Sequence, residues 1–486
     1  MDSPPITGTK SSSEKIGFLQ KMAYGSGMMS YVVMVRGVNQ FANPIFNDCM
    51  GVDPRLVSWV LGGSRLWDAV TDPMMGNITD NTRSRWGRRR PWIALGAMLS
   101  AITFAAIWLF PAGLSEMGYF LWFLCTSLVF FLAFTVFSVP YMALGMEMSP
   151  DYNERTAVVA YRTVISQVGA FLISGIYWFI SLDRFDDMAH GMRYAGIIAA
   201  VLIFSAGIVP ALFAREHQSV LDRQKKGKRV AKVSLVKSFM ETIRELPFQI
   251  LIGITVLMLI GLMLVGHLGY YVTVYHIFGG VKGESLGTLM AVGGISSQVC
   301  TMLFVPVLAK VSSQLGKRET LLVAMVLAII GSGLKWVCFT PDNPWLSIIP
   351  GIVMSGGLAA TWTLINAMIP DIVDLDELKT GERREGMYSA VYSWVFKLGV
   401  SLALVVSGYV LTWSGFNVDL GTDQSPQAIF YMRLFFTLIP VVSISLAFLL
   451  LLVYPLKESR VREIQAELKA RVNAEEEEEN KEKTND

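Results

Sequence analysis

The sequence has few charged residues and few cysteines for its length. Of 486 residues, 53% are hydrophobic and only 16% are Asp, Glu, Lys or Arg, against about 25% in soluble proteins. Intrinsic disorder requires the reverse composition and is excluded. The net charge of +2 is too small for a nucleic-acid-binding protein. The four cysteines include no CxxC pair, so neither a zinc site nor a disulfide framework is predicted.

Motifs of the common catalytic chemistries are also missing. The chain has no GxxxxGK[ST] nucleotide-binding motif, which argues against a pump that hydrolyses ATP itself. It has no HExxH, no GxSxG and no pair of histidines at metal-binding spacing. We therefore expect no catalytic residues, no bound metal and no cofactor, and we do not expect an enzyme.

The sequence is instead dominated by long apolar runs. A transmembrane helix needs about 20 mostly apolar residues, and twelve stretches meet this requirement, which predicts an all-α membrane protein. The twelve predicted spans are residues 18–46, 55–78, 92–111, 118–146, 157–181, 193–213, 246–275, 286–309, 320–339, 345–369, 388–412 and 429–454. The residues before the first span are polar, so we expect no cleaved signal peptide there.

Lys and Arg in the short loops set the expected orientation. They cluster at residues 82–90, 214–245 and 310–318, whereas the loops on the other side hold few of them. The positive-inside rule then places the basic loops and both termini in the cytoplasm. The acidic tail is expected to be a solvated appendage. The predicted cytoplasmic segments are residues 1–16, 214–245 and 456–486.

Two sequence landmarks recur at nearly the same offset along the chain. Gly87-Arg88-Arg89 follows the second span, and the similar Gly316-Lys317-Arg318 follows the eighth. Glu154-Arg155 follows the fourth span, and Glu382-Arg383 follows the tenth at almost the same separation. This predicts two pseudo-symmetric six-helix halves, at 17–213 and 246–455. The major facilitator fold is built in this way, with a substrate site near the middle of the membrane between the halves.

Ionisable residues inside spans are costly and usually mark a transport pathway. Asp68 and Asp72 lie four residues apart in the second span and share a helix face with Arg65 in reach. Two carboxylates in a low-dielectric site can hold a monovalent cation or share a proton, which favours a cation-coupling site. The alternative is a structural Arg–Asp pair that holds helices together.

Arg36 lies deep in the first span, with Asn39 and Gln40 on the same helix face. Its depth prevents easy snorkelling to the membrane surface. A guanidinium flanked by amides is suited to a carboxylate, sulfonate or phosphate group on a substrate. Pairing with Asp68 or Asp72 is the equally weighted alternative.

Further polar residues lie within later spans. Aromatic rings beside hydrogen-bond donors are typical of sugar sites, and Lys397 is too deep to be a surface lysine. We expect His267 to have a structural role with its ring nitrogens hydrogen-bonded. Lys335 lies near the end of a span, and its ammonium is expected to reach the membrane surface. The remaining candidate substrate residues are Arg162, Trp362, Asn366, Tyr392 and Ser393.

Two blocks of sequence carry a resemblance to a known family. Residues 65–76 read RLWDAVTDPMMG and are followed by RSRWG at 83–87. The second block runs from Asp371-Ile372-Val373-Asp374 to Lys397. They resemble the glycoside–pentoside–hexuronide:cation symporter family, the melibiose-permease-like branch of the major facilitator superfamily. The resemblance covers almost the whole chain and implies sugar import driven by Na⁺, Li⁺ or H⁺.

The resemblance assigns roles to individual positions. Asp68 and Asp72 match the family's cation-site carboxylates, Thr71 stands where the family has an Asn, and Thr135 matches a cation-site Thr. The positions that match the family's sugar pocket are Arg162, Trp362, Ser393 and Lys397, with Ser393 in place of a Thr.

The departures from the family pattern concern the pocket's acids. The family's sugar-binding Asp on the first helix is Val32 here, and an Asp on the fourth helix is Ser138. Asn39 replaces a pocket Tyr. Two acids are lost and Arg36 is gained, so with Arg162 and Lys397 the pocket should be net positive. A buried Arg without a counter-charge costs several kcal/mol, so we expect an anionic sugar: a hexuronate, an oligouronide or a sulfosugar.

The loss of the acid at Ser138 also weakens a Na⁺ site, which leaves H⁺ and Na⁺ both open as coupling ions. Alternative functions are transport of lysolipids or other amphiphiles, and transport of a neutral glycoside. We expect a monomer in a bacterial inner membrane, with the bilayer and a small sugar as its partners. Salt bridges at the cytoplasmic face are expected to act in gating, through Asp80, Arg85, Arg88, Glu154, Arg155, Asp371 and Asp374.

Overall fold

A computed structural model describes residues 16–149, 152–216, 240 and 242–485. Side chains are not described at positions 152, 153, 155, 156, 309, 472 and 474–485. The predicted N-terminal segment and most of the predicted central loop therefore lie outside the described residues. Within the described residues the regular structure is helical, as the composition predicts.

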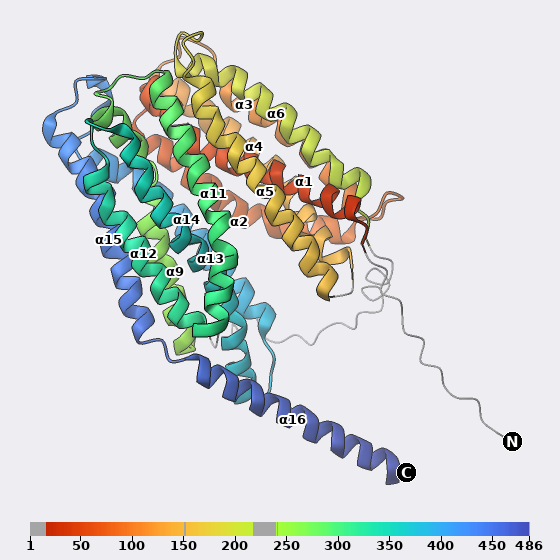
Figure 1. Cartoon of the computed structure of the whole chain (residues 1–486). Helices are drawn as coiled ribbons and strands as arrows, with labels where there is room; N and C mark the ends of the chain where they lie inside the picture. Colours follow the sequence, from red (N-terminus) through yellow and green to blue (C-terminus); the bar gives the residue numbers. More distant parts are fainter. Residues whose placement is uncertain (1–15, 150–151, 217–239, 241, 486) are drawn as a thin grey trace.

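The helices form two groups that follow each other along the chain (Figure 1). The first half consists of α1 (Phe18–Ala42), α2 (Pro54–Asn81), α3 (Arg90–Trp108), α4 (Glu116–Glu147), α5 (Tyr152–Ile180) and α6 (Met188–Phe213). The second half consists of α9 (Leu246–Met263), the short α10 (Leu268–Tyr271), α11 (Glu284–Leu315), α12 (Lys317–Cys338), α13 (Ile348–Thr380), α14 (Glu385–Trp413) and α15 (Pro426–Leu452). We call the end of the bundle with the loop 82–90 the basic end, and the end with residues 49–53 the opposite end.

Ten of the described helices are long and apolar enough to cross a membrane. The two predicted spans outside this group are α1 and α2, although both are long enough to cross. These two carry Arg36 and the cluster from Arg65 to Asp72, which lower their mean hydropathy. The helices match the predicted spans closely, and the largest difference is α13, which continues to Thr380, well beyond the predicted end at 369.

A local irregularity repeats between the halves. The first helix of each half ends in a π-helical turn, η1 (Asn43–Cys49) after α1 and η2 (Val272–Ile277) after α9 and α10. The starts of the two turns are separated by the same offset as the basic landmarks at Gly87 and Gly316. Single π-helical turns occur frequently at functional sites. The shared position supports the pseudo-symmetry predicted from the sequence.

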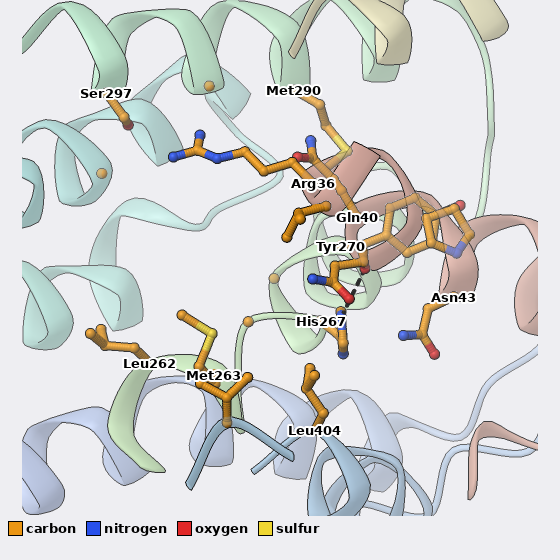
Figure 2. A pocket seen from close by; sticks show the side chains of 18 of the residues that line it. Arg36, Gln40, Asn43, Leu262, Met263, His267, Tyr270, Met290, Ser297 and Leu404 are labelled. Atoms are coloured by element: carbon orange, nitrogen blue, oxygen red, sulfur yellow. Dashed lines mark hydrogen bonds between the residues drawn. The ribbon is translucent and has the colours of Figure 1, made fainter. Parts of the chain in front are cut away.

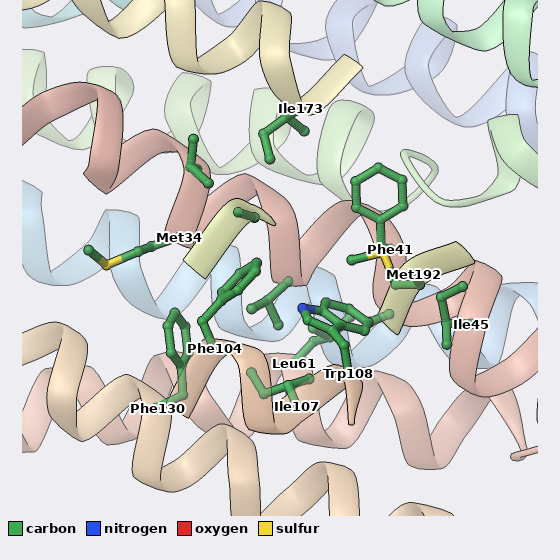
Figure 3. Close-up of a cluster of buried hydrophobic side chains, with 14 of the residues drawn as sticks. Met34, Phe41, Ile45, Leu61, Phe104, Ile107, Trp108, Phe130, Ile173 and Met192 are labelled. Carbon is green, nitrogen blue, oxygen red and sulfur yellow. The ribbon is translucent and has the colours of Figure 1, made fainter. Parts of the chain in front are cut away.

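Large aromatic side chains form the core of the first half. Phe104 and Trp108 of α3 pack with Phe130 of α4 and face Met34 and Phe41 of α1 (Figure 3). Between lipid-surrounded helices the gain comes from close van der Waals packing rather than from exclusion of water.

Small residues let the two halves approach each other along two helix pairs. α2 packs on α14, where the Ser401 hydroxyl donates a 2.7 Å hydrogen bond to the carbonyl of Gly62. α5 packs on α11, where a Cβ atom on Gly294 would lie 2.5 Å from the Ser174 hydroxyl. Helix pairs with small residues at the contact are typical of membrane bundles.

The C-terminal helix α16 (Glu458–Asn485) begins at the basic end and extends away from the bundle (Figure 1). Its first turns are not solvated as the sequence suggested. Ile464 is fully buried, Val461 is nearly so, and Arg471 donates a 3.1 Å hydrogen bond to the carbonyl of Leu378 on α13. The apolar residues among the charges of this segment dock it to the second half.

The close contact between α3 and α4 provides a test of the fold. A Cβ atom on Gly96 would lie 2.5 Å from the Cα atom of Phe137, so Gly96→Ala must push two backbones apart. Overpacking of this kind costs about 1–3 kcal/mol, and we expect a lower unfolding temperature in detergent. The matched control is Gly175→Ala on α5, where a Cβ atom has open space and no loss of stability is expected. Equal unfolding temperatures for the two variants would contradict the packing described here.

Candidate functional site

A cavity of about 1200 Å³ lies between the two halves (Figure 2). The first half contributes residues of α1, α2, α4 and α5, and the second half contributes residues of every helix from α9 to α15. Its charged and titratable lining residues include Arg36, Arg65, Asp68, Asp72, His267, Lys335 and Lys397. The cavity is therefore a largely apolar chamber between the halves, with a set of charged and polar side chains in its wall.

The opposite end of this chamber is closed by hydrogen bonds around Asp48 of η1. Its carboxylate accepts hydrogen bonds of 2.6 Å from the hydroxyls of Tyr270 and Tyr275, and pairs with the ammonium of Lys282 at 2.7 Å. The neighbouring Asn47 accepts a hydrogen bond from Tyr271. All four partners belong to the second half, so the π-helical turn at the end of α1 attaches one half to the other.

His267 adds a second connection between the halves. Its Nε2 atom lies 3.1 Å from the carbonyl oxygen of Asn39, and its Nδ1 atom lies 3.3 Å from the Ser407 hydroxyl. Both ring nitrogens are thus satisfied, in agreement with the structural role expected for this residue. Further hydrogen bonds between the halves join α2 to α14. Trp59 bonds to Tyr409 near the opposite end, and Lys397 bonds to Asp72 farther along the two helices.

The residues proposed as a cation site are brought together on α2 and α4. Asp72 accepts a 3.1 Å hydrogen bond from Thr135, and the hydroxyls of Thr71 and Thr135 are 3.1 Å apart. Asp68 pairs with Arg65 at 3.3 Å, and its Oδ1 atom is buried with no hydrogen-bond partner among the described residues. Hydrogen bonds therefore link Thr71, Thr135 and Asp72, and Asp68 lies one turn before Asp72 on α2.

Lys397 of α14 reaches Asp72 from the other half. Its ammonium lies 2.6 Å from the Oδ2 atom of Asp72, and both side chains are partly exposed to the cavity. Lys397 is therefore an ion-pair partner of the carboxylate site in this structure. The pair joins the two halves at mid-depth, where a substrate or cation entering the cavity can reach it.

Arg36, Asn39, Gln40, Ser138 and Ser393 line the same cavity. Arg36 is exposed to the cavity and makes no ion pair or hydrogen bond with a described residue, so the alternative that it pairs with Asp68 or Asp72 is not realised here. The Oδ1 atom of Asn39 is buried and unpartnered among the described residues. Unused polar groups of this kind are available to a ligand.

Three predicted substrate residues lie elsewhere. Trp362, Asn366 and Tyr392 line a smaller cavity of about 480 Å³, which shares Ser393 and Phe396 with the large one. The ring of Trp362 packs edge-on against Phe396 at 5.5 Å. Arg162 lies at the side of the large cavity, 3.3 Å from the sulfur of its lining residue Met142.

The predicted gating residues form ion pairs at the basic end. In the first half, Asp80 pairs with Arg88 and with Arg89, at 4.0 and 2.5 Å, and Glu154 pairs with Lys21 at 2.9 Å.

In the second half, Asp371 pairs with Lys317 at 2.7 Å and Asp374 with Arg383 at 3.1 Å. Each of these pairs joins residues of one half. Arg85 is exposed, and the side chain of Arg155 lies outside the described residues.

Sequence reasoning missed several lining residues, above all Lys335. It was expected to snorkel, but it is buried, lines the cavity and stacks on Phe436, with its ammonium 4.0 Å from the ring centroid. Tyr270 and Ser297 were also missed. Their side chains are ordinary in a membrane helix, so only the packing of the halves reveals them. For Lys335, the sequence did offer one signal of a cavity residue: it is a single lysine within an otherwise apolar span.

A helical bundle of two pseudo-symmetric halves around a chamber with charged side chains in its wall defines a transporter of the major facilitator type. A family model described as MFS/sugar transport protein matches residues 23–458. The chain belongs to this family, which confirms the resemblance found in its two sequence blocks. Family and relatives are transporters, and the chain is accordingly an integral multi-pass membrane protein and a symporter of this type.

Curated relatives span almost the full chain at low identity. An uncharacterized symporter of Synechocystis sp. is 26% identical over 95% of this chain and 98% of its own length. A sodium-dependent lysophosphatidylcholine symporter of Gallus gallus is 25% identical over 93% and 89%. An isoprimeverose transporter of Lactiplantibacillus pentosus is 25% identical over 84% and 82%. These relatives differ in substrate, so the family alone does not select one.

Solved structures support the fold. A structure of a proton-dependent oligopeptide transporter is similar with a TM-score of 0.65, at 15% identity, over 92% of this chain and all of that one. At this identity the similarity concerns the fold alone.

The cluster around Asp48 provides a test of the closed end. Asp48→Asn removes the charge that Lys282 and two tyrosines satisfy, and loss of even ~1.4 kcal/mol of closure shifts the open population tenfold. In a variant that keeps Cys49 as the only cysteine, we expect a membrane-impermeant maleimide to label Cys49 at least about tenfold faster. The control is Asp53→Asn, at the same end but paired with Arg55 of its own half. Unchanged labelling of Cys49 would show that Asp48 does not hold this end closed.

Proposed function

We propose that the protein imports an acidic sugar, namely a hexuronate, a short oligouronide or a sulfosugar, by symport with H⁺ or Na⁺. The proposal rests above all on Arg36, a guanidinium that faces a chamber between the halves with no acidic partner among the described residues. Arg36 is exposed to the cavity, and enclosing it there without a counter-charge would be unfavourable. A carboxylate or sulfonate on the substrate would supply the missing charge and accept paired hydrogen bonds from the guanidinium.

Polar groups near Arg36 suit the remainder of a sugar. Asn39 and Gln40 follow it on α1, and Asn39 has an unused buried oxygen. Trp362 lies in the adjoining cavity beside Ser393, where a sugar ring could pack its C–H face on the indole. Two connected cavities give room for more than one sugar ring.

The coupling site in this proposal is the group of Asp68, Asp72, Thr71 and Thr135. Its oxygens are the ligand type that Na⁺ prefers, and the two carboxylates can equally carry a proton. Lys397 now pairs with Asp72, so an arriving cation competes with this ammonium for the same carboxylate. Binding of the cation then releases Lys397 toward the cavity, where it can contact an anionic substrate.

The positive-inside rule places the basic end in the cytoplasm. In this orientation the cavity is closed toward the outside by the Asp48 cluster, and both termini are cytoplasmic. The bacterial relatives favour a bacterial inner membrane, and we propose that the protein acts as a monomer. The ion pairs at the basic end are proposed to exchange partners when the halves rock, because each now satisfies its charge within one half.

A second candidate is transport of a lysolipid. The relative from Gallus gallus carries that substrate in its name, and part of the cavity wall is apolar and includes Met290, Phe339 and Met354. A lysolipid would use the wall for its chain and Arg36 for its phosphate. The acidic sugar is favoured by Arg36, Asn39 and Gln40, three polar side chains of α1 that line the cavity.

Uptake by membrane vesicles tests the proposed substrate class. We expect accumulation of galacturonate or an acidic relative under a Na⁺ or a pH gradient, and no accumulation of melibiose, isoprimeverose or lysophosphatidylcholine. Arg36→Gln removes charge-assisted hydrogen bonds of about 1.5–3 kcal/mol and should raise KM roughly ten- to a hundredfold. Arg193→Gln on α6, outside the cavity lining, is the control. Uptake of melibiose alone, or an Arg36→Gln variant with unchanged KM, would refute the acidic-sugar proposal.

Replacement of one coupling carboxylate tests symport. In Asp68→Asn vesicles we expect loss of accumulation against a gradient, because the site no longer binds the coupling cation, while exchange of labelled for unlabelled substrate continues. Asp53→Asn, outside the cavity, serves as the control. Retained accumulation in Asp68→Asn would remove this residue from the coupling site.

A further inference from the structure

Lys335 is a buried ammonium that the mechanism so far does not use. It lies in the last turn of α12, is 9% exposed and lines the large cavity. Its side chain stands on the ring of Phe436, which in turn packs edge-on against Phe339 at 5.1 Å. No carboxylate among the described residues pairs with it.

Lys335 and Arg36 line the same cavity from opposite halves. Arg36 extends from α1 toward Ser297 of α11 (Figure 2). Ser297 faces Gly351 of α13, where a Cβ atom would lie 2.8 Å from the serine hydroxyl. Gly331 of α12 lies one turn before Lys335. It packs against Pro350 and Met354 of α13, the residues around Gly351. Opposite halves thus contribute the two cations to one cavity, in which Arg36 points toward Ser297.

The charges of the cavity do not balance. Arg65 is paired with Asp68, and Lys397 is paired with Asp72. Arg36 and Lys335 remain, so the described lining carries two positive charges without a counter-charge. A cation–π contact with Phe436 offsets only part of the cost of burying an ammonium. An anionic molecule that enters the cavity would supply the missing charge.

We propose that Arg36 and Lys335, with the Ser297 hydroxyl toward which Arg36 extends, form a two-cation subsite for a substrate that carries two negative charges. This inference rests on the proposed function and deepens it. Two sugar classes carry this charge: a short oligouronide with two carboxylates, and a sugar phosphate with one doubly charged group. Two cations contributed by different halves to a cavity of about 1200 Å³ suit two separated charges better than one doubly charged group, which favours the oligouronide.

Competition against labelled digalacturonate in vesicles tests the subsite. The competitors are galacturonate, digalacturonate and glucose 6-phosphate. In the wild type we expect digalacturonate to bind at least tenfold more tightly than galacturonate. Lys335→Gln should abolish this difference by weakening digalacturonate at least tenfold while galacturonate changes less than threefold. Lys335→Arg should restore the preference, and Lys310→Gln, an exposed lysine outside the cavity lining, should leave it unchanged.

A second variant tests the same subsite by adding charge. Ser297→Asp supplies a fixed carboxylate at the residue toward which Arg36 extends, and we expect it to remove the preference for digalacturonate as Lys335→Gln does. Unfolding temperatures of the purified variants separate loss of binding from loss of folding.

The outcomes separate this inference from the function on which it rests. Suppose that the wild type takes up acidic sugars and that Lys335→Gln still prefers digalacturonate. This result refutes the subsite and leaves the proposed function standing. The subsite is also refuted if Lys335→Gln weakens galacturonate and digalacturonate equally, because that result indicates a structural role. Tightest binding of glucose 6-phosphate assigns both cations to one phosphate and overturns the oligouronide assignment. A wild type that takes up no acidic sugar refutes both proposals.

Discussion

The ion pair between Asp72 and Lys397 is the interaction on which the arrangement of the cavity depends. It joins α2 and α14 at mid-depth and connects the two halves with a contact that a small ion can replace. Charges in a low-dielectric interior must be neutralised by partners close at hand. Asp68 meets this requirement within its own helix through Arg65, whereas Asp72 meets it only across the interface. The pairing of Asp72 is therefore linked to how the halves sit together.

The two ends of the cavity are held by different chemistry. At the opposite end, a single buried carboxylate, Asp48, collects three donors from the other half, so closure there is concentrated in one π-helical turn. At the basic end, acids such as Asp80 and Asp371 are already satisfied within their own halves. Opening the first end must break charged hydrogen bonds between halves, whereas closing the second requires a rearrangement of bonds within halves. Under the proposed function, this asymmetry would give rocking of the halves two separate energetic steps.

The sequence predicts the helices well and the site in part. Spans are readable because every backbone group in a bilayer must be paired, which leaves long apolar helices as the main signal. The grouping of Asp68, Asp72, Thr71 and Thr135 on α2 and α4 also followed from the sequence and its family resemblance. The separation of Trp362 from Arg36 did not, because periodicity locates a residue on its helix but not the depth at which two helices meet. The expectation for Lys335 failed for the same reason. A lysine near a helix end usually reaches water, and the sequence does not show that other helices cover this one.

The cavity holds two unpaired cations, Arg36 and Lys335, and one ion pair, Asp72 with Lys397. Together they give a physical reason why a cation and an acid would be transported together. Without a substrate, Arg36 and Lys335 keep the cavity positive, so enclosing it from both ends would bury uncompensated charge. An acid in front of Ser297 removes this cost. On the other side of the cavity, a cation at Asp72 frees Lys397, whose charge would again be unbalanced unless an anion is present. Each ligand thus lowers the cost of enclosing the other, and under the proposed function the doubly loaded cavity is the one that closes most readily.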